Sequence, residues 1–187
     1  MRDNIWFTYK ARINAHHRLE LMEKHSQFLL VWYAILGAVL SVVTIRYPKI
    51  IGDNTDIWAA ILSIVLLGVS LVVSNLDFRG RAIAMRKNYL ALQKLYSEIP
   101  QEHSLTSAQI AAYNDLLSEV ENHKEIDDKM ARVSSHLTLT TRNLTIEEIK
   151  EVRRFKIVRF TITSLLYFTP LILMWINYEC EIGRAHV

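Results

Sequence analysis

The chain has 187 residues, enough for one soluble domain, but uncharged apolar runs of 18, 20 and 19 residues take up a large share of it. This division favours an all-α integral membrane protein over a soluble globule. The 22 basic and 19 acidic residues give a net charge of +3, too small to indicate a nucleic-acid-binding protein. Five glycines and three prolines disfavour a turn-rich β fold, and the single cysteine, Cys180, excludes an internal disulfide.

The first 27 residues are polar and amphipathic, and their pattern predicts a helix over residues 5–25. His16 and His17 are adjacent, so on a helix their side chains would point in different directions. They could not form one ligand pair without rearrangement. We interpret both as surface residues near the membrane, with pH sensing as the alternative. A cleavable signal is not expected, because this long polar stretch precedes the first apolar run.

Two apolar runs, residues 28–45 and 57–76, are predicted to form a transmembrane hairpin. As helices they would cover about 27 and about 30 Å, close to the thickness of a hydrocarbon core. Pro48 and Gly52 lie in the short connection, which carries only two basic residues. More basic residues flank the pair, so the positive-inside rule places both flanks in the cytoplasm. These flanking residues are Lys10, Arg12, Arg18, Lys24, Arg79, Arg81, Arg86, Lys87 and Lys94.

One face of the second run is small and polar. Its residues follow one another at spacings of four, three, four and three, and they are Ser63, Leu67, Ser70, Ser74 and Asp77. Such a face could line a water-filled pore in an oligomer. The alternative is close helix packing, for which Gly37 and Ser41 on the first run offer a matching surface. Both interpretations predict a homo-oligomer.

Residues 77–159 are predicted to be a cytoplasmic helical region. A stripe is expected to continue from the second run and to end before Pro100, formed by Ile83, Leu90, Leu92, Leu95 and Tyr96. Two segments, 106–109 and 145–148, have the spacing of a capping box. The first predicts a helix whose apolar face is formed by Ile110, Tyr113, Leu116, Leu117 and Val120. The second predicts a helix that runs without a break into the third apolar run.

A polar cluster at residues 121–128 is the most suggestive group in this region. If it is helical, His123 and Asp127 share a face, a spacing that could hold a metal or orient a general base. A solvated helix end or a subunit contact on the cytoplasmic side explains the pair as well, and we prefer this interpretation because no second ligand pair accompanies it. We therefore assign no metal ligand and no catalytic residue.

The third apolar run, residues 160–178, is predicted to be a third membrane helix entered from the cytoplasm. Pro170 interrupts it, which membrane helices tolerate. The alternative is a buried or interfacial amphipathic helix. Five basic residues precede this run, and we attribute them to topology and lipid headgroups rather than RNA; they are Lys150, Arg153, Arg154, Lys156 and Arg159.

Residues 179–187 form a tail. From residue 181 its sequence matches the translation of a widely used sequencing-library adapter, and we interpret it as an assembly artefact. An ordinary polar tail is the alternative. These residues are excluded from functional reasoning.

No glycine-rich phosphate loop, nucleophile elbow, His-Glu-x-x-His or paired-cysteine motif occurs in the sequence. We therefore expect no enzyme and no cofactor.

Several short segments resemble the SLATT family, the SMODS- and SLOG-associating two-transmembrane effector domains of bacterial defence systems. The resemblance lies in residues 9–15 with Arg18 and Leu19, in the tight hairpin and the basic helix after it, and in segments 113–117 and 122–127. The charged C-terminal half is similar to the subfamily found beside reverse transcriptases. The third apolar run departs from a two-span description.

This resemblance implies an anti-phage effector that assembles in the bacterial inner membrane, opens or disrupts it when triggered, and kills or arrests the cell. The trigger in such systems is a nucleotide signal or a companion protein, so a nucleotide-synthesising enzyme or reverse transcriptase is an implied partner. The alternative function is a non-conducting anchor that recruits a soluble defence enzyme. A membrane enzyme using His123 and Asp127 ranks last.

Overall fold

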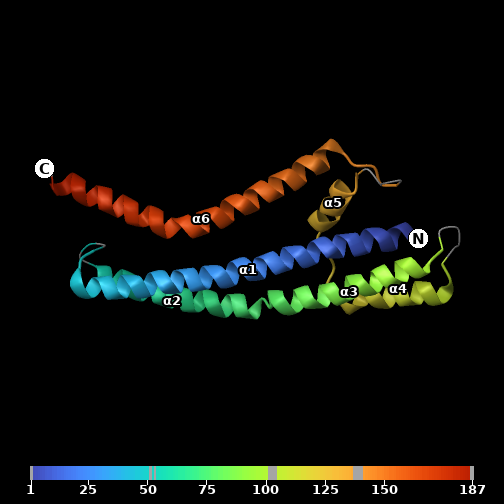
Figure 1. Ribbon diagram of the computed structural model, residues 1–187, viewed down its shortest axis with the longest axis horizontal. Coiled ribbons are helices and arrows are strands. Elements are labelled where there is room, and N and C mark those ends of the chain that lie inside the picture. The colour runs from blue at the N-terminus through green and yellow to red at the C-terminus, as the bar shows by residue number, and fades with distance from the viewer. Residues whose placement is uncertain (1, 51, 53, 101–104, 137–140, 186–187) are drawn as a thin grey trace. The chain divides into compact units, whose positions relative to one another are not determined.

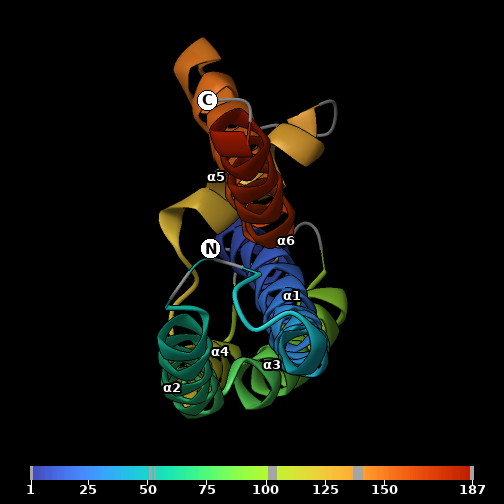
Figure 2. The same ribbon diagram turned by 90° about the vertical axis from the view of Figure 1, so that its left-hand side faces the viewer.

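The computed structural model describes residues 2–50, 52, 54–100, 105–136 and 141–185, without the side chains of 173, 174 and 176–185. These residues form six helices and no strand, which confirms the all-α prediction (Figures 1 and 2). The helices are α1 (Arg2–Arg46), α2 (Thr55–Asn75), α3 (Phe78–Glu98), α4 (Ser107–Glu119), α5 (Glu125–Ser134) and α6 (Ile146–Ala185).

The chain divides into two compact units. The polar unit contains Met1–Glu23 and Phe78–Ile157, and the apolar unit contains Lys24–Asp77 and Val158–Val187. Helix α1 belongs to both, because it begins in the polar unit and ends in the apolar unit. It stops at Arg46, just before the Tyr47-Pro48 pair, where the proline ring disfavours helical backbone in the preceding residue.

The polar unit has its main core where α1 meets α3. Ile5 and Tyr9 of α1 pack with Leu92 and Leu95 of α3, and partly buried side chains of α4 cover the cluster. A second, smaller cluster joins Leu19 to Phe78 and Ala82. The N-terminal amphipathic helix predicted from the sequence is therefore the central helix of this unit.

The buried face of α3 differs from the stripe expected from the sequence. Leu92 and Leu95 are buried as predicted, but Ile83 and Leu90 are 48% and 49% exposed. The buried positions are instead Phe78, Ala82, Met85, Asn88, Leu92 and Leu95. A polar residue, Asn88, lies on this buried face because its side chain forms hydrogen bonds with α1 and α4. The hydropathy of the sequence alone does not predict that Asn88 is buried.

The expected continuation of the second apolar run into α3 is wrong. Helix α2 ends at Asn75, and Asp77 has a left-handed backbone with φ of 40°. Aspartate adopts this conformation more readily than most residues do. Because Asp77 lies beyond α2, it does not share the helical face of Ser63, Ser70 and Ser74.

Both predicted capping boxes are present. Thr106 accepts from the Gln109 backbone N–H at 3.2 Å, and the Gln109 side chain accepts from the Thr106 backbone at 3.0 Å. Thr145 and Glu148 make the same reciprocal pair at 3.3 and 3.1 Å. The second box opens α6, which continues through Pro170 into the third apolar run, as predicted.

The apolar unit consists of helices with outward-facing apolar side chains. Three helical stretches of the described residues are long and apolar enough to cross a membrane: Arg2–Arg46, Thr55–Glu98 and Ile146–Ile172. Their most apolar windows have no residue buried inside the protein, and side chains such as Val42 and Phe160 are 68% and 75% exposed. A surface of this kind suits lipid or neighbouring spans rather than water.

Within this unit, α1 donates a hydrogen bond to a backbone carbonyl of α6 that has lost its usual donor because of Pro170. A proline has no N–H, so the carbonyl four residues earlier, that of Leu166, loses its usual donor. The Tyr33 hydroxyl donates to this carbonyl at 2.8 Å. Phe28 and Tyr167 pack edge to face beside it, with ring centroids 5.7 Å apart. Pro170 is therefore tolerated within an otherwise apolar helix.

The Arg18–Asp127 ion pair gives the first prediction. Arg18 is 8% exposed and Asp127 fully buried, so Arg18→Met should leave an uncompensated buried carboxylate and destabilise the polar unit by about 3–5 kcal/mol. Thermal unfolding in detergent, followed by circular dichroism, measures this. The exposed Arg81–Glu121 pair provides a matched control, since Arg81→Met should cost about 0–1 kcal/mol. Equal losses in the two variants would contradict the assignment.

The Tyr33 bond gives a second prediction. Tyr33→Phe should cost about 1–3 kcal/mol, because the Leu166 carbonyl is left without a donor in an apolar surrounding. Pro170→Leu restores a backbone N–H at that position, so in this background Tyr33→Phe should cost little. A double-mutant cycle on thermal unfolding in micelles measures the coupling. Additive losses would show that the hydroxyl does not replace the missing N–H.

Candidate functional site

Arg12 is a fully buried cation at the centre of the polar unit. Its guanidinium donates to the Asn88 side-chain carbonyl, to the Leu116 carbonyl at 2.9 Å and to the Leu117 carbonyl at 3.2 Å. Both backbone carbonyls lie in the last turns of α4, the end that carries the partial negative charge of a helix. Burial lowers the pKa of Arg12, but an arginine stays protonated and must be held by these acceptors.

Asn88 connects this cation to a carboxylate. Its amide donates to the Leu116 carbonyl at 2.8 Å and to Glu119 at 2.9 Å. Since its oxygen accepts from Arg12, the buried amide uses both ends in bonds that join α3, α1 and α4.

Asp127 fixes the beginning of α5 to α1. Its carboxylate accepts from Arg18 at 3.0 and 2.9 Å, and one of its oxygens also accepts from the Lys124 backbone N–H at 3.0 Å. Its backbone carbonyl accepts from the Asn14 side chain at 3.2 Å. Asp127 thus makes a contact within the chain that sequence reasoning did not identify.

The helical pairing of His123 with Asp127 is wrong. His123 lies in the extended segment before α5, which begins at Glu125. Its Nδ1 atom is buried without a hydrogen-bond partner among the described residues. Burial lowers the pKa of His123; the nearby Asp128 opposes this shift and Arg12 reinforces it. Burial therefore favours the neutral form of this imidazole.

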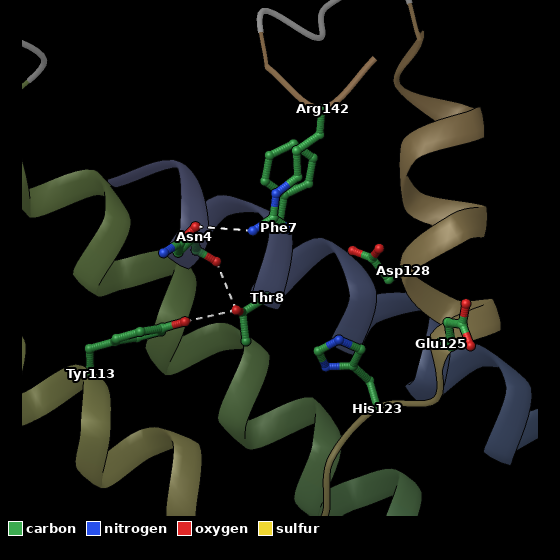
Figure 3. Close-up of a pocket in the computed structure, with 8 residues that line it drawn as sticks. All are labelled: Asn4, Phe7, Thr8, Tyr113, His123, Glu125, Asp128 and Arg142. Atoms are coloured by element: carbon green, nitrogen blue, oxygen red, sulfur yellow. Dashed lines mark hydrogen bonds between the residues drawn. The ribbon is translucent and has the colours of Figure 1, made fainter. Parts of the chain in front are cut away.

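His123 lines a pocket of about 390 Å³ in the polar unit (Figure 3). Arg142 closes one side, donating to the Asn4 side chain at 3.2 Å and lying 4.6 Å from the centre of the Phe7 ring. Thr8 and the Tyr113 hydroxyl are 2.9 Å apart on another side. The lining residues are Asn4, Phe7, Thr8, Tyr113, His123, Glu125, Asp128 and Arg142. Hydroxyl, amide and charged groups of both signs could hold a polar ligand.

The hydroxyl face predicted on the second apolar run lies on α2. Ser63, Leu67 and Ser74 are exposed and Ser70 is partly exposed. Ser63 and Ser70 donate back to the Ala59 and Leu67 carbonyls at 2.9 and 2.7 Å. In the single chain the hydroxyls of Ser63 and Ser70 are therefore satisfied within the helix, which is compatible with a neighbouring span or with a pore.

The predicted packing surface of Gly37 and Ser41 lies on α1. A side chain added at Gly37 would meet no atom within 4 Å, so the position is open in the single chain. Ser41 donates to the Gly37 carbonyl at 2.9 Å, which leaves the pair compact.

His16 and His17 were expected to point in different directions and to form no ligand pair without rearrangement, and they lie closer together than this suggested. Both side chains turn toward Glu20, and one ligand atom from each of the three residues lies within 4.8 Å of the others. The exposed carboxylate one turn further along α1 draws together two rings that helical spacing alone directs apart.

A family model described as "SMODS and SLOG-associating 2TM effector domain family 5" matches residues 1–177. The chain belongs to this family. The match covers both units, and the apolar helices agree with the membrane-effector description. Among curated proteins and among solved structures, nothing matches this family 5 chain.

Three of the segments on which the resemblance was based meet in the polar unit of the family 5 chain: residues 9–19, 113–117 and 122–127. Arg12 binds the carbonyls of Leu116 and Leu117, while Arg18 binds Asp127. The sequence contained a signal for this burial, because Arg12 lies on the same helical face as Ile5 and Leu19. Charged residues on an apolar face indicate buried polar partners. The pocket residues Asn4, Thr8 and Arg142 gave no such signal.

His123 gives a prediction about pH. The pKa of His123 in the folded chain lies below the ordinary 6.5, so the unfolded chain binds a proton more readily than the folded chain does. The stability that depends on the neutral ring is therefore present above pH 6.5 and is lost as the pH falls. The unfolding temperature of the natural chain should therefore drop more steeply below about pH 6.5 than that of His123→Gln. Thermal unfolding in detergent across this range measures the difference. Parallel curves would contradict the shift, and the exposed His136→Gln serves as control.

Proposed function

We propose that this chain is an effector of a bacterial anti-phage defence system that oligomerises in the inner membrane and opens or disrupts it when triggered. The observation that carries the proposal is the match of residues 1–177 to a family of membrane effector domains. The cell is killed or arrested because the membrane no longer holds its ion gradients.

The proposed conduction path is the face of α2 formed by Ser63, Leu67, Ser70 and Ser74, with Asp77 beyond the helix end. Two observations support it: the side chains lie on an exposed surface of the apolar unit, and small hydroxyl side chains allow both close helix approach and contact with water. Gly37 and Ser41 on α1 would let neighbouring spans approach, since Gly37 is open in the single chain.

The N-terminus is proposed to lie in the cytoplasm. Support comes from the basic residues that flank the hairpin, which outnumber those in its short connection. The polar unit would then face the cytoplasm, where His123 and the pocket beside it are accessible to a trigger. Residues 160–178 would add a third membrane helix, with the Tyr33 hydroxyl replacing the backbone donor lost at Pro170.

Gating would follow from differential binding. An activator that binds the open assembly better than the closed one shifts the population by the difference of the two affinities, and equal affinities shift nothing. We propose a nucleotide signal or a companion protein as activator, supplied by a nucleotide-synthesising enzyme or a reverse transcriptase.

Dye and ion leakage from vesicles containing the purified chain tests the conduction path. Replacing the two hydroxyls in Ser70→Leu/Ser74→Leu should lower leakage about tenfold or more, because water and ions lose their polar contacts along the helix. Val65→Leu/Val72→Leu places the same new side chain on the opposite face of α2, where both residues are exposed, and should leave leakage unchanged.

Two outcomes would contradict the proposal. Equal leakage from both double variants, at equal amounts of assembled protein, would remove the pore-lining assignment. A natural chain that neither leaks in vesicles nor lowers membrane potential on overexpression would favour the non-conducting anchor.

A further inference from the structure

A group of three ligand-type side chains lies on α1 within the polar unit, and none of the three lines the pocket described above. His16 Nε2 and His17 Nδ1 are each 3.9 Å from the same oxygen of Glu20. All three ligand atoms lie within 4.8 Å of one another. His17 and Glu20 are open to solvent, with side chains 62% and 42% exposed, whereas that of His16 is only 13% exposed.

The orientation of His16 is fixed by a bond to another helix. Its Nδ1 atom is 3.0 Å from the Ala82 carbonyl of α3, and the Tyr89 ring packs against it with centroids 5.7 Å apart. A carbonyl only accepts hydrogen bonds, so Nδ1 must carry the proton. In the neutral ring, Nε2 is then left with a lone pair directed toward the Glu20 carboxylate. A backbone carbonyl holds metal-binding histidines in this same way.

A cation between its members would stabilise this arrangement. The Nε2 lone pair and the Glu20 carboxylate are both electron donors, and two donors facing each other at 3.9 Å repel unless a positive charge lies between them. A proton on the imidazole or a metal ion would each turn this repulsion into an attraction. A proton would serve one histidine at a time, whereas a metal ion would use both rings and the carboxylate together.

We propose that His16, His17 and Glu20 form a binding site for a divalent transition-metal ion such as Zn²⁺. Imidazole and carboxylate ligands suit Zn²⁺, Ni²⁺ and Cu²⁺, whereas Mg²⁺ and Ca²⁺ prefer oxygen alone. A tetrahedral Zn²⁺ site separates its ligand atoms by about 3.4 Å, so the two pairs at 3.9 Å need to close only slightly. The exposed side chains of His17 and Glu20 can make this movement by rotation.

A metal ion in this site would stabilise one turn of α1. This turn lies near Glu23, where the section of α1 that belongs to the polar unit ends. It would also strengthen the His16–Ala82 contact, because a metal on Nε2 keeps the proton on Nδ1. The site is independent of the proposed pore and needs no conduction to be detected.

Calorimetric titration of Zn²⁺ into the full-length chain, in detergent and free of any polyhistidine tag, tests the proposal. One Zn²⁺ should bind per chain, the affinity should fall in acid because protons compete with the metal for the ring nitrogens, and Mg²⁺ should not compete. His17→Ala and Glu20→Gln should each weaken binding about tenfold or more. Neither change should unfold the chain, since both side chains are exposed.

His136→Ala is the matched control, because it removes an exposed histidine outside the group and should leave Zn²⁺ binding unchanged. A rise in unfolding temperature on adding Zn²⁺ should also appear in the natural chain and in this control, and it should be smaller in His17→Ala at the same Zn²⁺ concentration. No binding to the natural chain, or equal affinities of His17→Ala and His136→Ala, would overturn the proposal.

Discussion

Two buried arginines of α1 hold the polar unit together, because their charges must be compensated where water does not reach them. A buried guanidinium destabilises a protein unless hydrogen bonds and opposing charge replace its hydration. Arg12 finds these at the C-terminal carbonyls of α4 and at Asn88, and Arg18 finds them at Asp127. Each of these two sets of hydrogen bonds joins α1 to the end of a different helix. Because hydrogen bonds are directional and apolar contacts are not, these bonds select one arrangement of α4 and α5.

The helices joined in this way have little apolar interior of their own. Helix α4 has no fully buried residue, and α5 buries only Asp127 and Ala131. Neither could hold its position through hydrophobic burial alone. Exposed and partly exposed ion pairs add smaller contributions, such as Arg132 with Asp128 and Glu148, which connects α5 to the start of α6. The buried polar bonds thus involve three of the segments that resemble the effector family, residues 9–19, 113–117 and 122–127.

A different constraint governs the apolar unit. Its side chains face outward, so burial within the chain does not stabilise it, and every backbone donor and acceptor must instead find a partner without water. Regular helices satisfy this need except at Pro170, where the Tyr33 hydroxyl replaces the missing N–H. The same outward-facing surface makes association with lipid or with further copies the natural way to cover it.

The sequence by itself determined the helical class, the apolar spans and both capping boxes, because these depend on local spacing and hydropathy. It did not determine the end of α2 before Asp77, the exposure of Ile83 and Leu90, or the position of His123 outside a helix. Those features depend on partners far along the chain. Only the tertiary structure decided them, because a buried charge selects its acceptors by position in space rather than by separation in sequence.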